Sequence, residues 1–128
     1  MRLGFTGTRD GMTDQQKDKL IEVLDAYNIS QLHHGDCVGA DEFAHNLAKN
    51  MGIFVVVHPP IDPRLRAFCQ GDEIRDTLPY IERNHSIVDE TGALFVAPRT
   101  KEEQVRSGTW ATYRYARSME IPIWKADP

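Results

Sequence analysis

Cysteine is scarce in this sequence, and long apolar runs are missing. The 128 residues include only two cysteines, Cys37 and Cys69, whose number and spacing fit neither a disulfide framework nor a set of metal ligands. No apolar stretch approaches the roughly 20 residues that a membrane span needs, and the chain runs directly into a strand-like segment without a leader pattern. These absences predict a protein of the reducing cytoplasm that has no membrane partner.

An excess of basic charge is also lacking. The formal net charge is −4 at pH 7, so no basic surface field indicates binding to DNA or RNA, and nucleic acid is not the expected partner. The histidines, cysteines and acids show no zinc-type spacing, and we expect neither a metal nor a cofactor. Internal repeats, low-complexity tracts and linkers are absent as well, which predicts one domain over residues 1–128.

Short apolar runs alternate with helix-like patterns along the chain. The expected strands are residues 2–6, 29–34, 53–58, 93–97 and 121–124, and the expected helices follow a capping box at Thr13 and Gln16, span 40–51, begin at Pro79, and span 109–119. In the last helix the pattern predicts an inner line of Ala111, Tyr115 and Met119. Residues 59–79 are rich in proline, and we interpret them as a long, partly helical surface excursion.

This alternation predicts an α/β fold. Strands and helices at this spacing imply right-handed crossovers and a parallel sheet that is covered on both faces. We therefore expect a Rossmann-like three-layer sandwich with a mainly parallel five-stranded sheet in the order 3-2-1-4-5. In that order the switch point lies between strands one and four, and ligands of such folds bind there, at the carboxyl edge of the sheet.

Three glycine-bearing turns lie at that predicted edge. They are Gly7-Thr8-Arg9, the segment 35–41, and Ser107-Gly108-Thr109. Glycine lets backbone N–H groups approach a ligand, and a helix N-terminus adds partial positive charge, so such turns suit phosphate groups. Each turn alone has a steric explanation, Thr109 equally suits a helix cap, and Arg9 equally suits solvent. Three turns at one edge favour a ligand site.

Carboxylates flank the second turn, and a tryptophan follows the third. Asp36 and Asp41 are suited to hydrogen-bond ribose hydroxyls or to act as general acid or base. Asp41 equally suits a first-turn acid that interacts with the helix dipole. Trp110 either stacks on a base or packs in the core. The second turn therefore indicates a sugar-binding position or the place for acid–base chemistry.

Several of these strings resemble the SLOG superfamily, which joins the DNA-processing protein DprA and the cytokinin-activating LOG enzymes. The turn from Gly35 to Asp41 is similar to a G-G-A-x-G-A-D turn, Arg83-Asn84 to an R-N helix, and Gly7-Thr8-Arg9 to the G-x-R opening of small stand-alone members. The likeness covers nearly the whole chain, and it implies a Rossmann-like fold that holds a nucleotide or nucleotide-derived ligand at the carboxyl edge. The candidate ligand-binding residues are then Gly7, Thr8, Arg9, Gly35, Asp36, Gly39, Ala40, Asp41, Arg83, Asn84, Ser107, Gly108, Thr109 and Trp110.

The sequence departs from the LOG pattern at the third turn. LOG enzymes carry P-G-G-x-G-T-x-x-E, whose glutamate serves phosphoribohydrolase chemistry, whereas here only Gly108-Thr109 matches and Thr112 stands at the glutamate position. Asp36 replaces the second glycine of the G-G-A-x-G-A-D turn and adds a negative charge. The resemblance and its departures together predict a binding module for a nucleotide or nucleotide derivative, in the role of a sensor, and disfavour LOG-type hydrolysis.

Two other functions stay open. One is a nucleotide N-glycosidase that uses Asp36 or Asp41, the two candidate catalytic residues. The other is DprA-like binding of single-stranded DNA, against which the charge balance weighs. The expected partner is a small nucleotide-derived molecule, and the sequence leaves open a homodimer.

Overall fold

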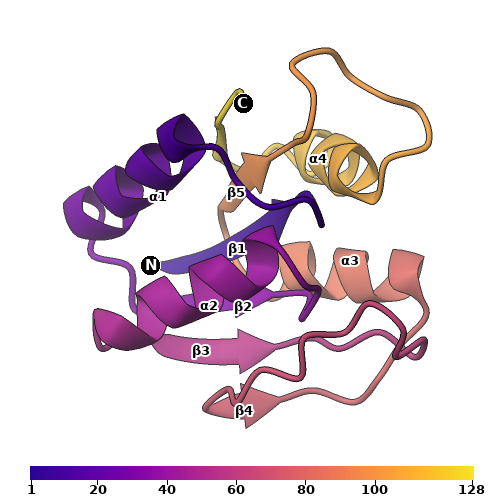
Figure 1. The fold of residues 1–128 in the computed structure, drawn as a ribbon, viewed down its shortest axis with the longest axis horizontal. Helices are drawn as coiled ribbons and strands as arrows, with labels where there is room; N and C mark the ends of the chain where they lie inside the picture. Colours follow the sequence, from indigo (N-terminus) through magenta and orange to yellow (C-terminus); the bar gives the residue numbers. More distant parts are fainter.

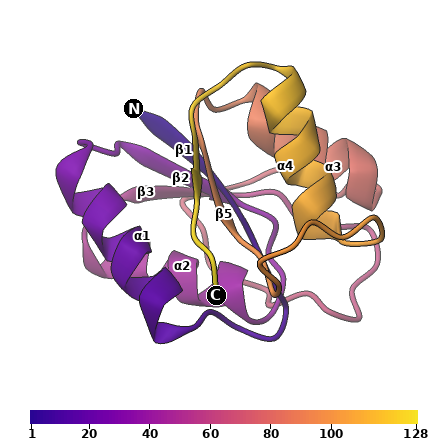
Figure 2. The same ribbon diagram turned by 90° about the horizontal axis from the view of Figure 1, so that it is seen from above.

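Six parallel strands form one twisted sheet in the computed structural model, which describes residues 1–128 (Figure 1). The strands are β1 (Arg2–Gly7), β2 (Gln31–His34), β3 (Phe54–Val57), β4 (Glu73–Ile74), β5 (Leu94–Ala97) and β6 (Ile123–Lys125). The helices are α1 (Asp14–Ala26), α2 (Ala40–Asn50), α3 (Tyr80–Asp89) and α4 (Gly108–Ser118). Helices α1 and α2 cover one face of the sheet and α3 and α4 the other, which gives three layers (Figure 2).

The strand order is β4-β3-β2-β1-β5-β6, and every neighbouring pair is parallel. Five of these strands confirm the expected order, because β3-β2-β1-β5-β6 corresponds to 3-2-1-4-5. The order reverses between β1 and β5, where Gly7 lies opposite Ala97. The Rossmann-like sandwich is therefore confirmed, and its switch point lies beside the end of β1.

The sixth strand corrects the prediction of a five-stranded sheet. Strand β4 lies within the segment 59–79 and pairs with the outer side of β3: the Asp72 N–H donates to the Val55 carbonyl (2.9 Å) and the Arg75 N–H to the Val57 carbonyl (2.8 Å). No helix forms between α2 and α3, so the interpretation of this segment as partly helical is wrong. A strand of two residues is too short for a periodic sequence pattern, and prolines keep the rest of the segment out of a helix.

The middle strands are buried on both faces, as continuous apolar runs in a parallel sheet should be. Leu3 and Phe5 of β1 are fully buried, and the Phe5 ring stacks on the ring of Phe95 with centroids 5.7 Å apart. A smaller hydrophobic cluster on the other face of the sheet includes Ile87 of α3 and Ala116 of α4. These contacts fix β1 and β5 against each other, and the ends of both strands therefore have well-defined positions.

Gln16 connects the start of α1 to the ends of two strands. The expected capping box is confirmed: the Gln16 N–H donates to Thr13 Oγ1 (3.2 Å), and the Thr13 N–H donates to Gln16 Oε1 (3.0 Å). The buried Gln16 side chain also donates from Nε2 to the carbonyls of Pro98 (2.8 Å) and Ala126 (2.9 Å), just beyond β5 and β6. One amide thus satisfies two carbonyl groups that water cannot reach. None of the four helices is both long and apolar enough to cross a bilayer.

Replacing Gln16 with leucine is expected to lower the free energy of unfolding by about 2–4 kcal/mol, because two buried carbonyls lose their donor and the capping box is broken. Urea denaturation measures the change. Gln15→Leu is the matched control, since it removes the same amide from an exposed position one residue earlier. If both variants unfolded at the same urea concentration, the role assigned to Gln16 would be wrong.

Candidate functional site

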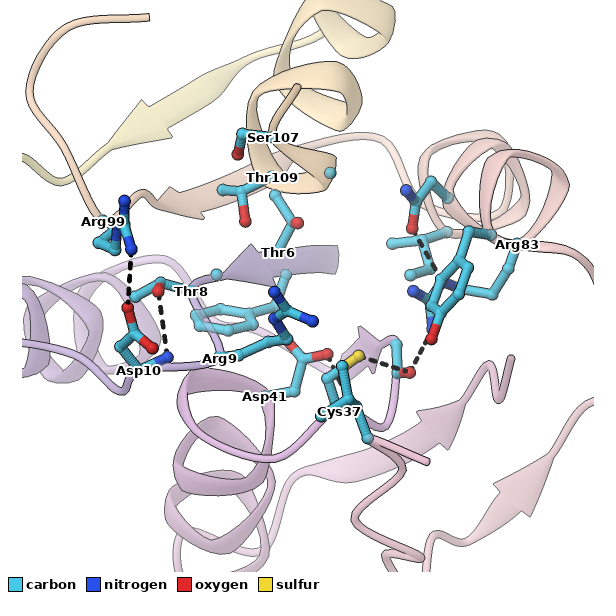
Figure 3. A pocket seen from close by; sticks show the side chains of 18 of the residues that line it. Thr6, Thr8, Arg9, Asp10, Cys37, Asp41, Arg83, Arg99, Ser107 and Thr109 are labelled. Carbon is cyan, nitrogen blue, oxygen red and sulfur yellow. Dashed lines mark hydrogen bonds and ion pairs between the residues drawn. The ribbon is translucent and has the colours of Figure 1, made fainter. Parts of the chain in front are cut away.

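A cavity of about 460 Å³ opens at the carboxyl edge of the sheet, where the loops after β1, β2 and β5 meet (Figure 3). Its volume lies in the range of small-molecule sites. The wall is formed by Phe5, Thr6, Gly7, Thr8, Arg9, Asp10, Gly35, Cys37, Asp41, Leu65, Tyr80, Arg83, Asn84, Ile87, Arg99, Gln104, Arg106, Ser107, Gly108 and Thr109. Segments far apart in the sequence therefore share one concave surface.

Most of the residues proposed from the sequence line this cavity. They are Gly7, Thr8, Arg9, Gly35, Asp41, Arg83, Asn84, Ser107, Gly108 and Thr109. The first and third glycine turns meet because β1 and β5 are neighbours at the switch point. Four proposed residues, Asp36, Gly39, Ala40 and Trp110, lie outside the wall, and each has a structural environment that explains why.

The N-terminus of α4 supplies the site with unpaired backbone donors. Ser107 caps the helix by accepting from the Trp110 N–H (3.2 Å), whereas the N–H groups of Gly108 and Thr109 have no acceptor within the protein. Both residues line the cavity, as does Thr6 near the end of β1. A helix N-terminus with free N–H groups is a favourable position for an anion.

Arginine dominates the charge around the cavity. Arg9, Arg83, Arg99 and Arg106 line it, against the carboxylates of Asp10 and Asp41. Arg99 lies 3.5 Å from Asp10 at the exposed rim, whereas no carboxylate pairs with Arg9 or Arg106. The cavity is thus locally positive in a chain whose net charge is −4. Such a site attracts a small anion without a basic outer surface.

Arg83 is the buried arginine among these four, and it lies at the right of the cavity in Figure 3. Its guanidinium donates from Nη1 to the carbonyls of Gly35 and His58 and from Nε to Asn84 Oδ1 (2.8 Å). A Cβ at position 35 would come within 2.7 Å of the guanidinium, so glycine at this position permits the close approach of Arg83. The R-N pair of α3 therefore fixes the second turn against the cavity.

Gly39 and Ala40 hold the second turn against the first. The Ala40 N–H donates to the Thr8 carbonyl (3.0 Å), and Gly39 has a φ of 88° with the Arg9 carbonyl packed where a Cβ would lie. The first N–H of α2 therefore donates to a carbonyl oxygen of the protein itself. Gly39 and Ala40 lie outside the cavity wall, whereas Gly108 and Thr109 at the N-terminus of α4 line it.

Asp36 connects the second turn to the segment 59–79. Its buried carboxylate accepts from Arg66 Nε (2.6 Å) and from the Cys69 N–H (2.9 Å), and its carbonyl accepts from the Ala67 N–H (2.7 Å). These contacts hold Leu65 of the same segment in the cavity wall. All of the carboxylate's observed partners lie outside the cavity, so its contacts are those of a structural residue.

Asp41 is the buried carboxylate that does line the cavity. Its side chain is 4% exposed; Oδ2 accepts from the Cys37 N–H (3.2 Å), and Oδ1 has no hydrogen-bond partner. Burial raises the pKa of Asp41 to about 6, although the nearby Arg83 guanidinium acts in the opposite direction. Of the two proposed catalytic acids, only Asp41 adjoins the space where a ligand would lie.

Trp110 packs inside the protein. It is 3% exposed, its ring meets the edge of the Tyr113 ring, and the Lys125 ammonium lies 5.5 Å from its centroid. The expected inner line of α4 was wrong: Trp110, Thr112 and Ala116 are buried, and Met119 is half exposed. The aromatic ring is therefore on the core side of the helix rather than beside the cavity.

The cavity also contains residues that the sequence did not single out. They are Phe5, Thr6, Asp10, Cys37, Leu65, Tyr80, Ile87, Arg99, Gln104 and Arg106. Arg99 and Arg106 belong to the loop before α4, which Arg114 holds by donating to Glu103 (2.9 Å) and to the Val105 carbonyl (3.2 Å). These two arginines could have been expected from the position of the loop in the sequence, because it connects β5, the strand beside the switch point, to the third turn.

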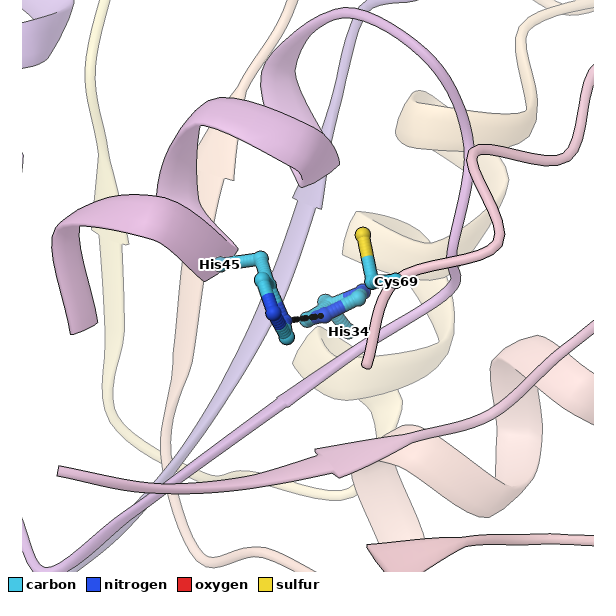
Figure 4. Close-up of side chains that lie close together, drawn as sticks. All are labelled: His34, His45 and Cys69. Atoms are coloured by element: carbon cyan, nitrogen blue, oxygen red, sulfur yellow. Dashed lines mark hydrogen bonds between the residues drawn. The ribbon is translucent and has the colours of Figure 1, made fainter. Parts of the chain in front are cut away.

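Two groups of histidines lie below the second turn. In one, His34 Nε2 lies 3.0 Å from His45 Nδ1, with Cys69 nearby (Figure 4). The Asp36 N–H donates to His34 Nδ1 (2.9 Å), so that nitrogen carries no proton and the Nε2 proton is donated to His45. A metal ion bound to His34 Nε2 would displace that proton, and the imidazole of His34 would then carry no proton on either nitrogen, which is unfavourable. Burial also raises the pKa of Cys69 to about 12, and the group as it stands is a hydrogen-bonded core.

The second group links β2 to β3. His33 Nδ1 lies 2.9 Å from His58 Nε2, and both rings are almost fully buried. Burial lowers the pKa of His33 and of His58 to about 4, although Glu90, whose carboxylate lies 3.8 Å from His58, opposes the shift. The two rings are therefore neutral in the folded protein at neutral pH and share one hydrogen bond.

No protein-family model matches the chain, and no curated protein matches its sequence. Solved structures do share its fold. The molybdenum cofactor binding protein from the phototrophic bacterium Rippkaea orientalis has a TM-score of 0.73 at 17% identity, over 97% of this chain and 74% of that one. DNA processing protein A (DprA) from Streptococcus pneumoniae has a TM-score of 0.71 at 19% identity, over 97% and 49%.

The Moco carrier protein from Chlamydomonas reinhardtii is a third match, with a TM-score of 0.67 at 19% identity over 98% of this chain and 75% of that one. The chain spans about half the length of the DprA structure. These matches extend over nearly all of the present chain. The chain thus shares the fold of these three proteins.

Acidification is expected to destabilise the fold through the buried histidine pair. Because folding lowers both pKa values from 6.5 to about 4, the unfolded chain binds protons between those values that the folded chain does not. Stability is therefore present above pH 6.5 and is lost as the pH falls toward 4, by at least about 2 kcal/mol. Urea denaturation of the wild type and of His58→Gln between pH 6.5 and pH 4 tests this prediction. If the free energy of unfolding fell equally steeply with pH in both proteins, the histidine pair would not be the cause.

Asp36→Asn is expected to destabilise the protein by about 3 kcal/mol, because it leaves the partly buried Arg66 guanidinium without its counter-charge. The matched control is Asp62→Asn, which removes a carboxylate paired with the exposed Arg64 in the same segment. Thermal and urea denaturation compare the variants. A change no larger in Asp36→Asn than in Asp62→Asn would show that the Asp36 contacts do not stabilise the fold.

Proposed function

We propose that this protein binds a nucleotide or a nucleotide-derived small molecule in the cavity, with a phosphate group at the N-terminus of α4. The observation that carries the proposal is the combination of free N–H groups on Gly108 and Thr109 with unpaired arginines in the same cavity. Phosphate oxygens accept hydrogen bonds from backbone N–H groups, and guanidinium groups bind them in a bidentate manner. A charged ligand of this kind satisfies both features at once.

The opposite end of the cavity suits a flat, apolar group. Leu65 comes from the segment 59–79, and Tyr80 and Ile87 come from α3. Tyr80 is 40% exposed, so its ring remains available for contact with a ligand. A nucleobase offers the planar surface that such side chains bind. The cavity thus combines an anionic subsite and an apolar subsite, and a nucleotide has the matching two ends.

The structural neighbours give independent support for a small ligand. One is a molybdenum cofactor binding protein and another a Moco carrier protein. A DprA neighbour from Helicobacter pylori is described by its single-stranded DNA binding mode. In the present chain the net charge is −4, and the arginines described above gather around a cavity, which favours a small molecule over a nucleic acid strand.

Hydrolysis of the ligand is the second candidate, and Asp41 is the observation that favours it. A buried carboxylate with a raised pKa at a cavity wall is typical of a general acid or base. Thr112, at the position of the LOG glutamate, is buried, and its hydroxyl donates to the Gly108 carbonyl (2.9 Å). A LOG-type carboxylate is therefore missing, and N-glycosidase chemistry here would depend on Asp41.

Thr109→Val is expected to weaken binding of the preferred nucleotide about tenfold or more, since a hydrogen bond to a charged phosphate is lost. Calorimetric titration with the four common ribonucleoside 5′-monophosphates and diphosphates identifies that nucleotide. Binding of the matching nucleoside, which has no phosphate, should not respond to the substitution. Thr77→Val, which changes an exposed threonine outside the cavity, is the matched control.

Two results would count against this proposal. If the wild type bound the nucleotide and the matching nucleoside equally well, no phosphate would lie at the N-terminus of α4; equal affinity of wild type and Thr109→Val would exclude only the Thr109 hydroxyl from the phosphate site. Free base in the titrated mixtures, detected by chromatography and abolished by Asp41→Asn, would replace simple binding with N-glycosidase activity.

A further inference from the structure

We infer that Asp41 binds a sugar hydroxyl of the nucleotide, and that this residue makes the cavity sensitive to the hydroxyl pattern of the ribose. The inference rests on the proposed nucleotide binding and names the part of the ligand that meets the second turn. It also separates the roles of the two acids in that turn. Asp36 holds the turn to the segment 59–79, and Asp41 contacts the ligand.

The first argument is the unsatisfied oxygen of Asp41. Its Oδ1 atom is almost completely covered and accepts no hydrogen bond of normal geometry, although the Gly35 N–H lies near the carboxylate, while Oδ2 accepts from the Cys37 N–H. A buried carboxylate oxygen without a donor is unfavourable, and it becomes favourable when a ligand donates a hydrogen bond to it. The side chain forms part of the cavity wall, so a bound molecule adjoins it. The missing partner is therefore a donor group on the ligand.

The second argument concerns the charge of that donor group. A phosphate carries acceptor oxygens and negative charge, and the Asp41 carboxylate repels it. Burial raises the pKa of Asp41 only to about 6, so the group is an ionised acceptor at pH 8. The ligand part beside it must be a neutral O–H or N–H donor. This excludes the phosphate and leaves the sugar or the base.

The third argument separates these two. The donor-bearing edge of a base such as guanine presents two N–H groups side by side, and a carboxylate binds such an edge with both oxygens. In Asp41 one oxygen already accepts from the Cys37 N–H, and Oδ1 is the oxygen that lacks a donor. A single hydroxyl can supply that donor. The residue is thus better matched to the sugar than to the base.

The order of the subsites agrees with this assignment. The α4 N-terminus follows β5 and the α2 N-terminus follows β2, with β1 between them. Two strand spacings correspond to about 9.5 Å, too far for one phosphate group to span. Figure 3 shows Asp41 between the Thr109 side and the Arg83 side of the cavity, and Tyr80 belongs to the same helix as Arg83. The group between phosphate and base in a nucleotide is the sugar.

The test compares three forms of the nucleotide preferred by the wild type: the ribose form, the 2′-deoxy form and the 3′-deoxy form. Titration calorimetry at pH 8 is carried out on the wild type, Asp41→Leu and Asp41→Asn. In the wild type, loss of one hydroxyl should weaken binding about tenfold or more, because the bond lost is to a charged acceptor. In Asp41→Leu the three forms should bind equally, and in Asp41→Asn the difference should shrink.

The controls keep this inference separate from the proposed function. Asp62→Asn changes a carboxylate outside the cavity, which pairs with the exposed Arg64, and should retain the wild-type preference. The gain in affinity from the 5′-phosphate should be retained in both Asp41 variants. Circular dichroism checks that both variants fold. If Asp41→Leu does not fold, the comparison of the ribose and deoxy forms in Asp41→Asn is the decisive measurement.

Three results would overturn the inference. In the first, the wild type binds the ribose form and both deoxy forms equally well, while the phosphate still strengthens binding; the proposed function then stands and the role of Asp41 falls. In the second, the preference for a hydroxyl persists undiminished in the Asp41 variants. In the third, the wild type binds none of the nucleotides, and both the proposed function and the inference fail.

Discussion

The contact between the first turn and the start of α2 is the constraint on which the site depends. The Thr8 carbonyl accepts from the Ala40 N–H, and the Arg9 carbonyl lies where any side chain at position 39 would be. Gly7 packs just as closely on Ala40. These contacts provide the first N–H of α2 with an acceptor from the backbone of the protein itself. The start of α2 is thus held against the first turn, and the N–H groups of Gly108 and Thr109 in α4 remain free at the cavity.

Electrostatics and shape then act together. Arginines gather around a concave site, while the chain as a whole is acidic. Low-dielectric walls focus the field of such a site, so a small anion is attracted into the cavity while an extended polyanion meets a repulsive surface. The two carboxylates of the cavity wall also differ from each other. Asp10 is exposed and paired with Arg99, whereas Asp41 is buried and has one oxygen without a hydrogen-bond donor. The paired carboxylate is thus exposed to solvent, and the carboxylate with a free oxygen is covered by the protein.

The sequence predicted those parts of the fold that repeat a pattern. Five strands, their order and the meeting of the first and third turns followed from apolar runs and from the topology of parallel sheets. Strand β4 did not, because two residues carry no period. The side to which a carboxylate points is likewise absent from the sequence: Asp36 adopts a φ of 59° and turns toward Arg66. Trp110 was misplaced because a shift of one residue turns the buried line of a helix by about 100°, and the buried residues of α4 include Trp110 and Ala116 where Ala111 and Tyr115 were expected.

The short strand β4 forms one edge of the sheet and limits how that edge can pair with another molecule. Its side chains are exposed, and Glu73 pairs with Arg75, which in turn reaches Glu90 (2.8 Å). An edge strand of two residues surrounded by charge offers too few free N–H and C=O groups to guide a strand from another molecule. The irregular segment thus protects an otherwise open parallel sheet against edge-to-edge aggregation, and it does so with the same loop that contributes Leu65 to the cavity.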